Sequence, residues 1–180
     1  MRLKTIGLMV LGIALLVGCG GGDERVELPD DFDPEAAIQK WVAEFQPSVL
    51  SAEEQAEELR WFASAAEPFR GMEIKSVAEG IRTHTWESEV LAPAFFEITG
   101  IKVTHDIIGE GTIVDRVQTQ IQTGRKLYDI YVNDADLIGT HLRMDSALNL
   151  TEYMAGEGAD VTNPGLDLDD FLNLEFGQDY

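Results

Sequence analysis

Two stretches with apolar residues at helical spacing predict two short helices in residues 33–70. The first is expected to begin at Asp33, which suits a helix N-cap, with Pro34 at the first helical position. Its apolar stripe consists of Ile38, Trp41, Val42 and Phe45. The second is expected to begin at Ser51, because Ser51 and Glu54 have the spacing of a capping box.

Residues 71–180 carry alternating and apolar stretches that predict strands separated by helices. Strands are expected over 72–78, 101–108 and 128–132, and helices over 84–99 and 112–123. A connection that contains a helix is long enough to join parallel strands by a right-handed crossover. The predicted fold class is therefore α/β, with a parallel βαβαβ sheet preceded by two short helices.

Local signals predict how the two crossover helices begin and end. Gly100 and Gly124 are expected to terminate them, because glycine readily adopts the left-handed backbone of a helix C-cap. Pro93 removes a hydrogen-bond donor from the middle of the first helix and predicts a bend. Thr112 and Asp115 are expected to cap the second helix.

Trp86 has two interpretations. It lies on the same predicted helical stripe as Val90 and Phe95, which places it in the core. An exposed indole would instead offer a flat surface on which a sugar ring stacks. The core position is the expectation.

The predicted sheet also locates a candidate site. In an open parallel sheet the ligand crevice lies outside the carboxyl ends of the strands, which here are followed by the loops 79–84, 109–111 and 133–136. The candidate ligand-binding residues in these loops are Glu79, Thr83, His84, Glu110, Asn133, Asp134 and Asp136. We expect the three loops to meet at one edge of the sheet.

The amino-acid composition excludes several kinds of partner and site. The 180 residues include 13 Lys and Arg against 33 Asp and Glu, which gives a net charge of −20 and excludes nucleic acid as an electrostatic partner. One cysteine rules out an intrachain disulfide and a cysteine-based zinc cluster. The length suits one compact domain of the usual size.

The first 18 residues are typical of a secretory signal peptide. Arg2 and Lys4 precede an apolar run of about 14 residues, which is too short for a permanent membrane span. Leu16-Val17-Gly18-Cys19 resembles the lipobox of bacterial lipoproteins, in which the cysteine is lipidated and becomes the new N-terminus. The mature chain is then expected to be exported and lipid-anchored to the outer face of a membrane.

These signals divide the chain into four parts. Residues 1–18 form the signal peptide, and residues 19–32 carry the lipidated Cys19 and a flexible acidic linker. Residues 33–70 form the helical segment, and residues 71–180 form the partial α/β lobe.

A family resemblance rests on two segments of the α/β part. Residues 95–103, Phe-Phe-Glu-Ile-Thr-Gly-Ile-Lys-Val, resemble a segment of the extracellular solute-binding proteins (family 1) of bacterial ABC importers. Tyr128-Asp129-Ile130 is similar to the Tyr/Pro-Asp-Val element of the same family. Segments 136–141, 154–158 and 161–171 are similar to a subgroup associated with carbohydrates and polyols.

The resemblance implies a two-lobed protein of the periplasmic-binding-protein type II fold that closes on a solute and delivers it to permease subunits. Counterparts of the second lobe are not seen in this sequence, so the chain is expected to be a truncated form that carries most of the first lobe. The implied ligand is a carbohydrate or polyol, and neither a cofactor nor a metal is expected. An unpaired sheet edge predicts that this lobe folds only marginally on its own.

Each candidate site residue also has a simpler interpretation. Carboxylates of Glu79, Glu110, Asp134 and Asp136 would accept hydrogen bonds from adjacent sugar hydroxyls, but they equally suit solvated loops. His84 and Glu87 have a spacing that two metal ligands use. The other histidines, His105 and His141, do not supply an evident third ligand.

Two other functions remain open. The acidic helices of residues 33–66 would serve as spacer or docking surface in a scaffold lipoprotein without solute binding. A surface glycosidase would use a carboxylate pair whose separation a sequence does not reveal. The sequence lacks a Gly-x-Ser-x-Gly elbow and a phosphate-binding P-loop, and we expect a protein that is not an enzyme.

Overall fold

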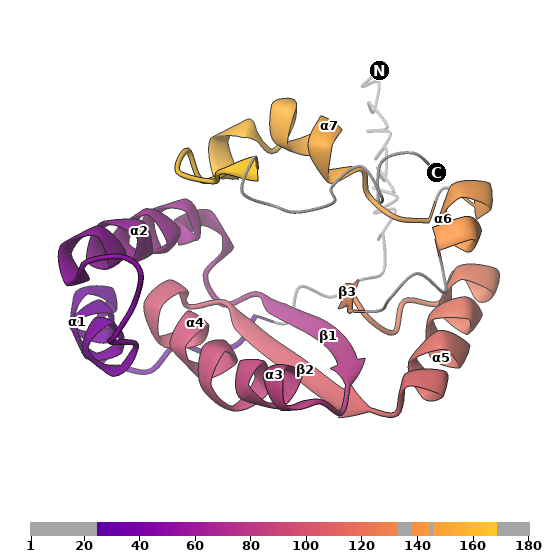
Figure 1. Cartoon of the computed structure of the whole chain (residues 1–180), viewed down its shortest axis with the longest axis horizontal. Helices are drawn as coiled ribbons and strands as arrows, with labels where there is room; N and C mark the ends of the chain where they lie inside the picture. Colours follow the sequence, from indigo (N-terminus) through magenta and orange to yellow (C-terminus); the bar gives the residue numbers. More distant parts are fainter. Residues whose placement is uncertain (1–24, 133–137, 145, 169–180) are drawn as a thin grey trace, which may run out of the picture.

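The computed structural model describes residues 25–132, 138–144 and 146–168, which form an α/β arrangement with a small parallel sheet (Figure 1). Two helices come first, α1 (Pro34–Glu44) and α2 (Ala52–Ala65), followed by the 3₁₀ turn η1 (Glu67–Phe69). Asp33 caps α1 by accepting hydrogen bonds from the backbone N–H groups of residues 35 and 36, and Ser51 and Glu54 form the capping box of α2. Both predicted helix starts are confirmed.

Three parallel strands form the sheet: β1 (Glu73–Glu79), β2 (Lys102–Ile108) and β3 (Ile130–Tyr131). Their order is β2-β1-β3, so the first strand lies in the middle. The β1–β2 register begins at Glu73↔Lys102 and ends at Glu79↔Ile108. The predicted parallel βαβαβ arrangement is confirmed, with a third strand shorter than expected.

The first crossover consists of three helical pieces, α3 (Arg82–Trp86), the π-helical turn η2 (Glu87–Leu91) and α4 (Ala92–Thr99). The Ala92 N–H donates to the Glu87 carbonyl, five residues back, as a π-helical turn requires. Pro93, which lacks an N–H and whose ring crowds the preceding turn, follows immediately. The π-helical turn therefore ends just before Pro93, the residue at which a bend is predicted, and Pro93 lies in the first turn of α4.

The π-helical turn also explains why Trp86 is not in the core. Its side chain is 48% exposed and contacts Phe45 with ring centroids 6.3 Å apart. The predicted apolar stripe assumes the same number of residues in every helical turn. A π-helical turn contains more residues than an α-helical turn, so the residues before η2 point in a different direction from the one that the α-helical period predicts. The core position predicted for Trp86 is wrong.

The second crossover helix is α5 (Glu110–Thr123), which starts two residues before the predicted position. Its N-cap is Gly109, which has no side chain to act as a cap, and Thr112 lies inside the first turn. The capping pair predicted from Thr112 and Asp115 is wrong. Gly100 and Gly124, at φ +75° and +66°, terminate α4 and α5 as expected.

The described part of the chain ends in short elements: α6 (Ile138–Met144), α7 (Leu150–Ala155) and the 3₁₀ turn η4 (Ala159–Val161). Asn149 caps α7 by accepting a hydrogen bond from the Glu152 N–H. None of the described helices combines the length and the apolar character that crossing a membrane requires.

The described residues form two hydrophobic cores, one between the sheet and α5 and one among the helices α1, α2 and α4. On one face, Val77 of β1 packs with Ile113 and Val117 of α5 and with Tyr128. On the other side, α1 and α2 pack against α4 around Ile38. In Figure 1 these three helices gather beside one end of the sheet, away from α5. The acidic helices therefore share a core with the α/β part, which argues against a free spacer.

The segment that carries the family resemblance is the junction of α4 and β2, and its polar residues have structural roles. Thr99 Oγ1 donates to the Phe95 carbonyl at 2.6 Å and accepts from the Ile101 N–H at 3.1 Å. A Cβ at Gly100 would lie 3.1 Å from a Leu28 methyl carbon and 3.2 Å from Phe32. The local fold therefore accounts for the Thr-Gly pair at 99–100, and no ligand is needed to explain these two residues.

Candidate functional site

The carboxyl ends of β1 and β2 lie next to each other, because Glu79 pairs with Ile108 at the last position of the register. His84, on α3, turns back so that its Nδ1 lies 3.1 Å from the Glu79 carbonyl oxygen. Glu110 begins α5 directly after β2, where a helix N-terminus favours negative charge. The structure thus places Glu79, His84 and Glu110 at one edge of the sheet.

The other candidate residues divide into two groups. Thr83 lies on α3 with an exposed side chain, one residue before His84. Asn133, Asp134 and Asp136 lie outside the described residues. β3 runs parallel to β1, with Ser76↔Ile130 and Val77↔Tyr131, so it points toward the same edge. Two of the three predicted loops therefore meet as expected, and the third lies outside the described residues.

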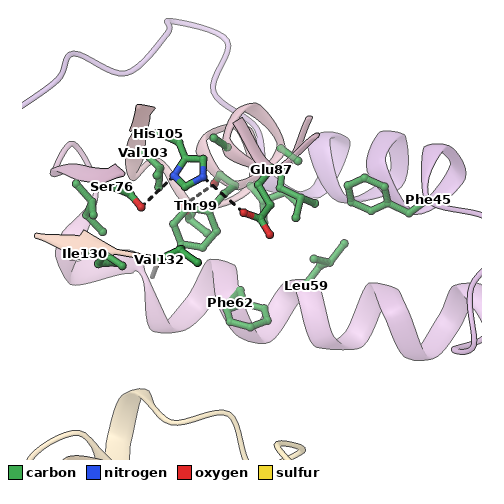
Figure 2. A pocket seen from close by; sticks show the side chains of 16 residues that line it. Phe45, Leu59, Phe62, Ser76, Glu87, Thr99, Val103, His105, Ile130 and Val132 are labelled. Atoms are coloured by element: carbon green, nitrogen blue, oxygen red, sulfur yellow. Dashed lines mark hydrogen bonds and ion pairs between the residues drawn. The ribbon is translucent and has the colours of Figure 1, made fainter. Parts of the chain in front are cut away.

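A feature that the sequence analysis missed is a cavity of about 490 Å³ between the sheet, α2 and α4 (Figure 2). Its lining is almost wholly apolar and includes Leu59, Phe62, Ile74, Phe95, Val103 and Ile130. Four polar residues also line it, Ser76, Glu87, Thr99 and His105, and three of them, Ser76, Glu87 and His105, lie within contact of one another.

The three polar side chains form a connected cluster around His105. Its Nδ1 lies 3.0 Å from Ser76 Oγ, and its Nε2 lies 3.5 Å from Glu87 Oε2 (Figure 2). Ser88 Oγ donates to the His105 carbonyl at 3.0 Å, so η2 contacts this strand residue twice. The imidazole is only 7% exposed, and among the described residues its Nε2 makes no hydrogen bond.

The pattern along the strands contained a signal for this cluster. Alternation places Ser76 between Ile74 and Ala78 on one face of β1, and His105 between Val103 and Ile107 on the same face of β2. One polar residue within an apolar face is common, but two at paired positions in adjacent strands indicate a shared polar contact. The register needed to recognise it is not visible in the sequence.

On the opposite face, α5 fixes the start of β3. Gln120 Oε1 accepts hydrogen bonds from the N–H groups of Leu127 and Tyr128 at 2.7 and 2.8 Å, and its Nε2 donates to the Tyr128 carbonyl at 2.9 Å. Arg116 donates to the Tyr128 hydroxyl at 2.6 Å. These contacts position the Tyr-Asp-Ile segment beside β1.

Asp129 extends the pairing of β3 with β1. Its Oδ2 accepts from the Lys75 N–H at 2.9 Å, its own N–H donates to the Lys75 carbonyl at 2.8 Å, and its carboxylate pairs with Lys126. Burial acts to raise the pKa of Asp129, but the hydrogen bonds from Lys126 and the Lys75 N–H, together with both lysine charges, outweigh it. The pKa of Asp129 therefore lies below its ordinary value.

Comparison of the chain with protein-family models, curated proteins and solved structures finds no match. Interpretation of the site therefore depends on the geometry and on the sequence. Within the described residues, no group of three or more His, Cys, Asp and Glu side chains is arranged to hold a metal ion.

The role of Asp129 predicts how stability depends on pH. A carboxylate whose pKa is lower in the folded chain stabilises it above the unfolded pKa of about 3.9, and this contribution is lost as the pH falls through the folded pKa. We expect Asp129→Asn to lower the free energy of unfolding at pH 6 by about 1–2 kcal/mol, and by less at pH 3. Urea unfolding between pH 3 and pH 6 measures the difference.

The control for this prediction is Asp115→Asn, at an exposed position of α5. That variant should follow the wild-type pH profile closely. A constant difference between Asp129→Asn and wild type from pH 3 to pH 6 would contradict the role assigned to the Asp129 carboxylate.

Proposed function

We propose that this chain is the substrate-binding component of an ABC importer, which captures a carbohydrate or polyol outside the membrane and delivers it to the permease. The observation that supports the proposal is the edge where β1 and β2 end together, with Glu79, His84 and Glu110 beside it. Ligands of open parallel sheets bind at such an edge. The segment that resembles the solute-binding family leads directly into β2.

The chemistry of this edge suits hydroxyl groups. Carboxylates of Glu79 and Glu110 would each accept hydrogen bonds from hydroxyls on adjacent carbons. His84 Nδ1 donates to the Glu79 backbone carbonyl, so the ring nitrogen left for a hydroxyl would be Nε2. In this proposal the described sheet belongs to the first lobe of a type II binding fold, and a second lobe would close over the solute. Lipidation of Cys19 would hold the protein at the outer face of the membrane.

Binding to a panel of sugars and polyols tests the function. A solute at 100 times its dissociation constant should stabilise the folded chain by about 2.7 kcal/mol, which appears as a rise in Tm. We expect Glu79→Gln/Glu110→Gln to weaken binding at least about tenfold, because an amide accepts a hydroxyl less strongly than a carboxylate does. Saturation-transfer NMR detects weak binding, and the thermal shift ranks the solutes.

Glu58→Gln, at an exposed position of α2, provides the matched control and should bind as wild type does. A folded chain without any response to the panel would contradict solute binding. That outcome would favour the alternative, an acidic interaction module, for which the exposed Glu53 and Glu57 of α2 supply a negatively charged surface.

A further inference from the structure

Three polar contacts join the helical segment of α3 and η2 to the sheet. His84 Nδ1 donates to the Glu79 carbonyl at 3.1 Å, and Ser88 Oγ donates to the His105 carbonyl at 3.0 Å. Glu87 Oε2 lies 3.5 Å from His105 Nε2. Two of these contacts end on His105, in the middle of β2. His105 therefore holds η2, while His84 lies on α3, which comes directly before η2.

The helix α3 depends on its neighbours for its orientation. It has five residues, its N-cap Ile81 supplies no side-chain hydrogen bond, and none of its residues is fully buried. A helix this short is marginal by itself. Within the described part of the chain, α3 packs mainly against η2. The direction in which His84 points therefore follows the orientation of η2.

The ring of His105 is itself fixed from several directions. Its Nδ1 lies 3.0 Å from Ser76 Oγ on β1, as Figure 2 shows. The ring of His84 contacts it edge to face, with centroids 6.3 Å apart. The Glu87 carboxylate favours a proton on the facing Nε2, so Nδ1 accepts from the Ser76 hydroxyl. At 7% exposure the imidazole is too buried to touch a solute, so it can act only through its neighbours.

This polar cluster is an unfavourable choice where stability is the only requirement. Among the described residues, His105 Nε2 makes no hydrogen bond, and well-packed apolar side chains are often at least as stable as buried charged ones. Its neighbours in the cavity wall include the apolar Ile74, Val103 and Ile130. A polar cluster in such surroundings supports a role in orientation, because polar contacts are directional.

We propose that His105 is a positioning residue for the solute edge. Through Glu87 and Ser88 it fixes the orientation of η2 and α3, and thereby the direction of His84. The inference rests on the proposed function, in which His84 Nε2 faces a solute hydroxyl. Because the Glu79 carbonyl only accepts hydrogen bonds, it keeps the His84 proton on Nδ1. His105 thus controls which ring nitrogen of His84 a solute meets.

NMR of the ring nitrogens of His84 tests the proposal in the full chain without a solute, because protonated and bare ring nitrogens have different shifts. In the wild type we expect His84 to be held in the Nδ1–H form. Glu87→Ala should lose this form, so that the two tautomers average. Glu89→Ala, at an exposed position of the same π-helical turn, is the matched control and should preserve it.

Two substitutions of His105 separate its polar contacts from its volume. His105→Phe keeps an aromatic ring beside His84 and removes the side-chain contacts with Ser76 and Glu87, so it should behave as Glu87→Ala does. His105→Gln keeps a side-chain N–H that can face Glu87 and should restore the wild-type His84 signals. Circular dichroism reports whether each variant is folded.

Solute affinity distinguishes failure of the positioning role from failure of the proposed function. With the best solute of the sugar and polyol panel, Glu87→Ala and His105→Phe should bind at least about fivefold more weakly, the loss expected for one hydrogen bond. His105→Gln and Glu89→Ala should bind as the wild type does. If the wild type binds no solute, the proposed function is contradicted, and the His84 signals still decide the positioning role.

Two results would overturn the positioning role. The first is an unchanged Nδ1–H form of His84 in folded Glu87→Ala and His105→Phe, because lower stability alone would then make the cluster merely structural. The second is an equal loss of this form in Glu89→Ala, which would show that any change in η2 disturbs His84 without the contact to His105.

Discussion

Replacement of Trp41 by alanine is expected to lower the free energy of unfolding by about 3–5 kcal/mol, the range for removal of a buried aromatic side chain. Trp41 is 8% exposed and belongs to the core that α1 and α2 form with α4. Its Nε1 donates to Glu97 Oε2 at 2.8 Å, and its ring lies 5.4 Å from that of Phe45. The substitution removes packing and an inter-helix hydrogen bond together.

Two variants divide this effect into its parts. Trp41→Phe keeps an aromatic ring and should lose only about 1–2 kcal/mol, because the indole donor and part of the volume disappear. Trp61→Ala, on α2 outside the buried cluster, should cost about 1 kcal/mol or less. Urea unfolding followed by far-UV circular dichroism measures all three. Similar losses for Trp41→Ala and Trp61→Ala would show that α1 is not anchored on α4.

Replacement of Ile113 by alanine is expected to cost about 3 kcal/mol, because its side chain is fully buried between α5 and the sheet. All three tryptophans, Trp41, Trp61 and Trp86, lie in or beside the helices on the other side of the sheet. β1 and β2 connect the two cores. In Ile113→Ala we therefore expect the urea midpoint measured by tryptophan fluorescence to fall together with the midpoint measured by circular dichroism.

Ile113→Val is the matched control and should cost about 1 kcal/mol, because it removes a single methylene group. An unchanged fluorescence midpoint in Ile113→Ala, with a shifted circular dichroism transition, would contradict coupling of the two cores. The helical side would then unfold independently of α5.

Local chemistry made much of the fold predictable. Asp33, Ser51, Gly100 and Gly124 act through neighbours within a few residues, so their helix boundaries follow from the sequence. The start of α5 was missed because Gly109 offers no side-chain signal. The orientation of Trp86 was not predicted because the π-helical turn after it changes the direction in which the preceding side chains point. The amino-acid composition of a segment does not predict such a turn.

The candidate site was predictable to a smaller extent. The strand ends followed from alternation and from the parallel crossovers, which is why Glu79 and Glu110 were found. The cluster of Ser76, Glu87 and His105 depends on strand register and on η2, both of which arise from tertiary packing. Paired polar positions on an apolar sheet face are the signal that would have located it.

The strand order has a consequence for folding during synthesis. β1 emerges from the ribosome first but needs partners on both sides, with Ser76 meeting His105 29 residues later and Lys75 meeting Asp129 54 residues later. Until β3 has been translated, one edge of the central strand stays open on the nascent chain. The sheet therefore assembles late, because strands that are far apart in the sequence must first come together. The helices α1 and α2 can already form in the growing polypeptide.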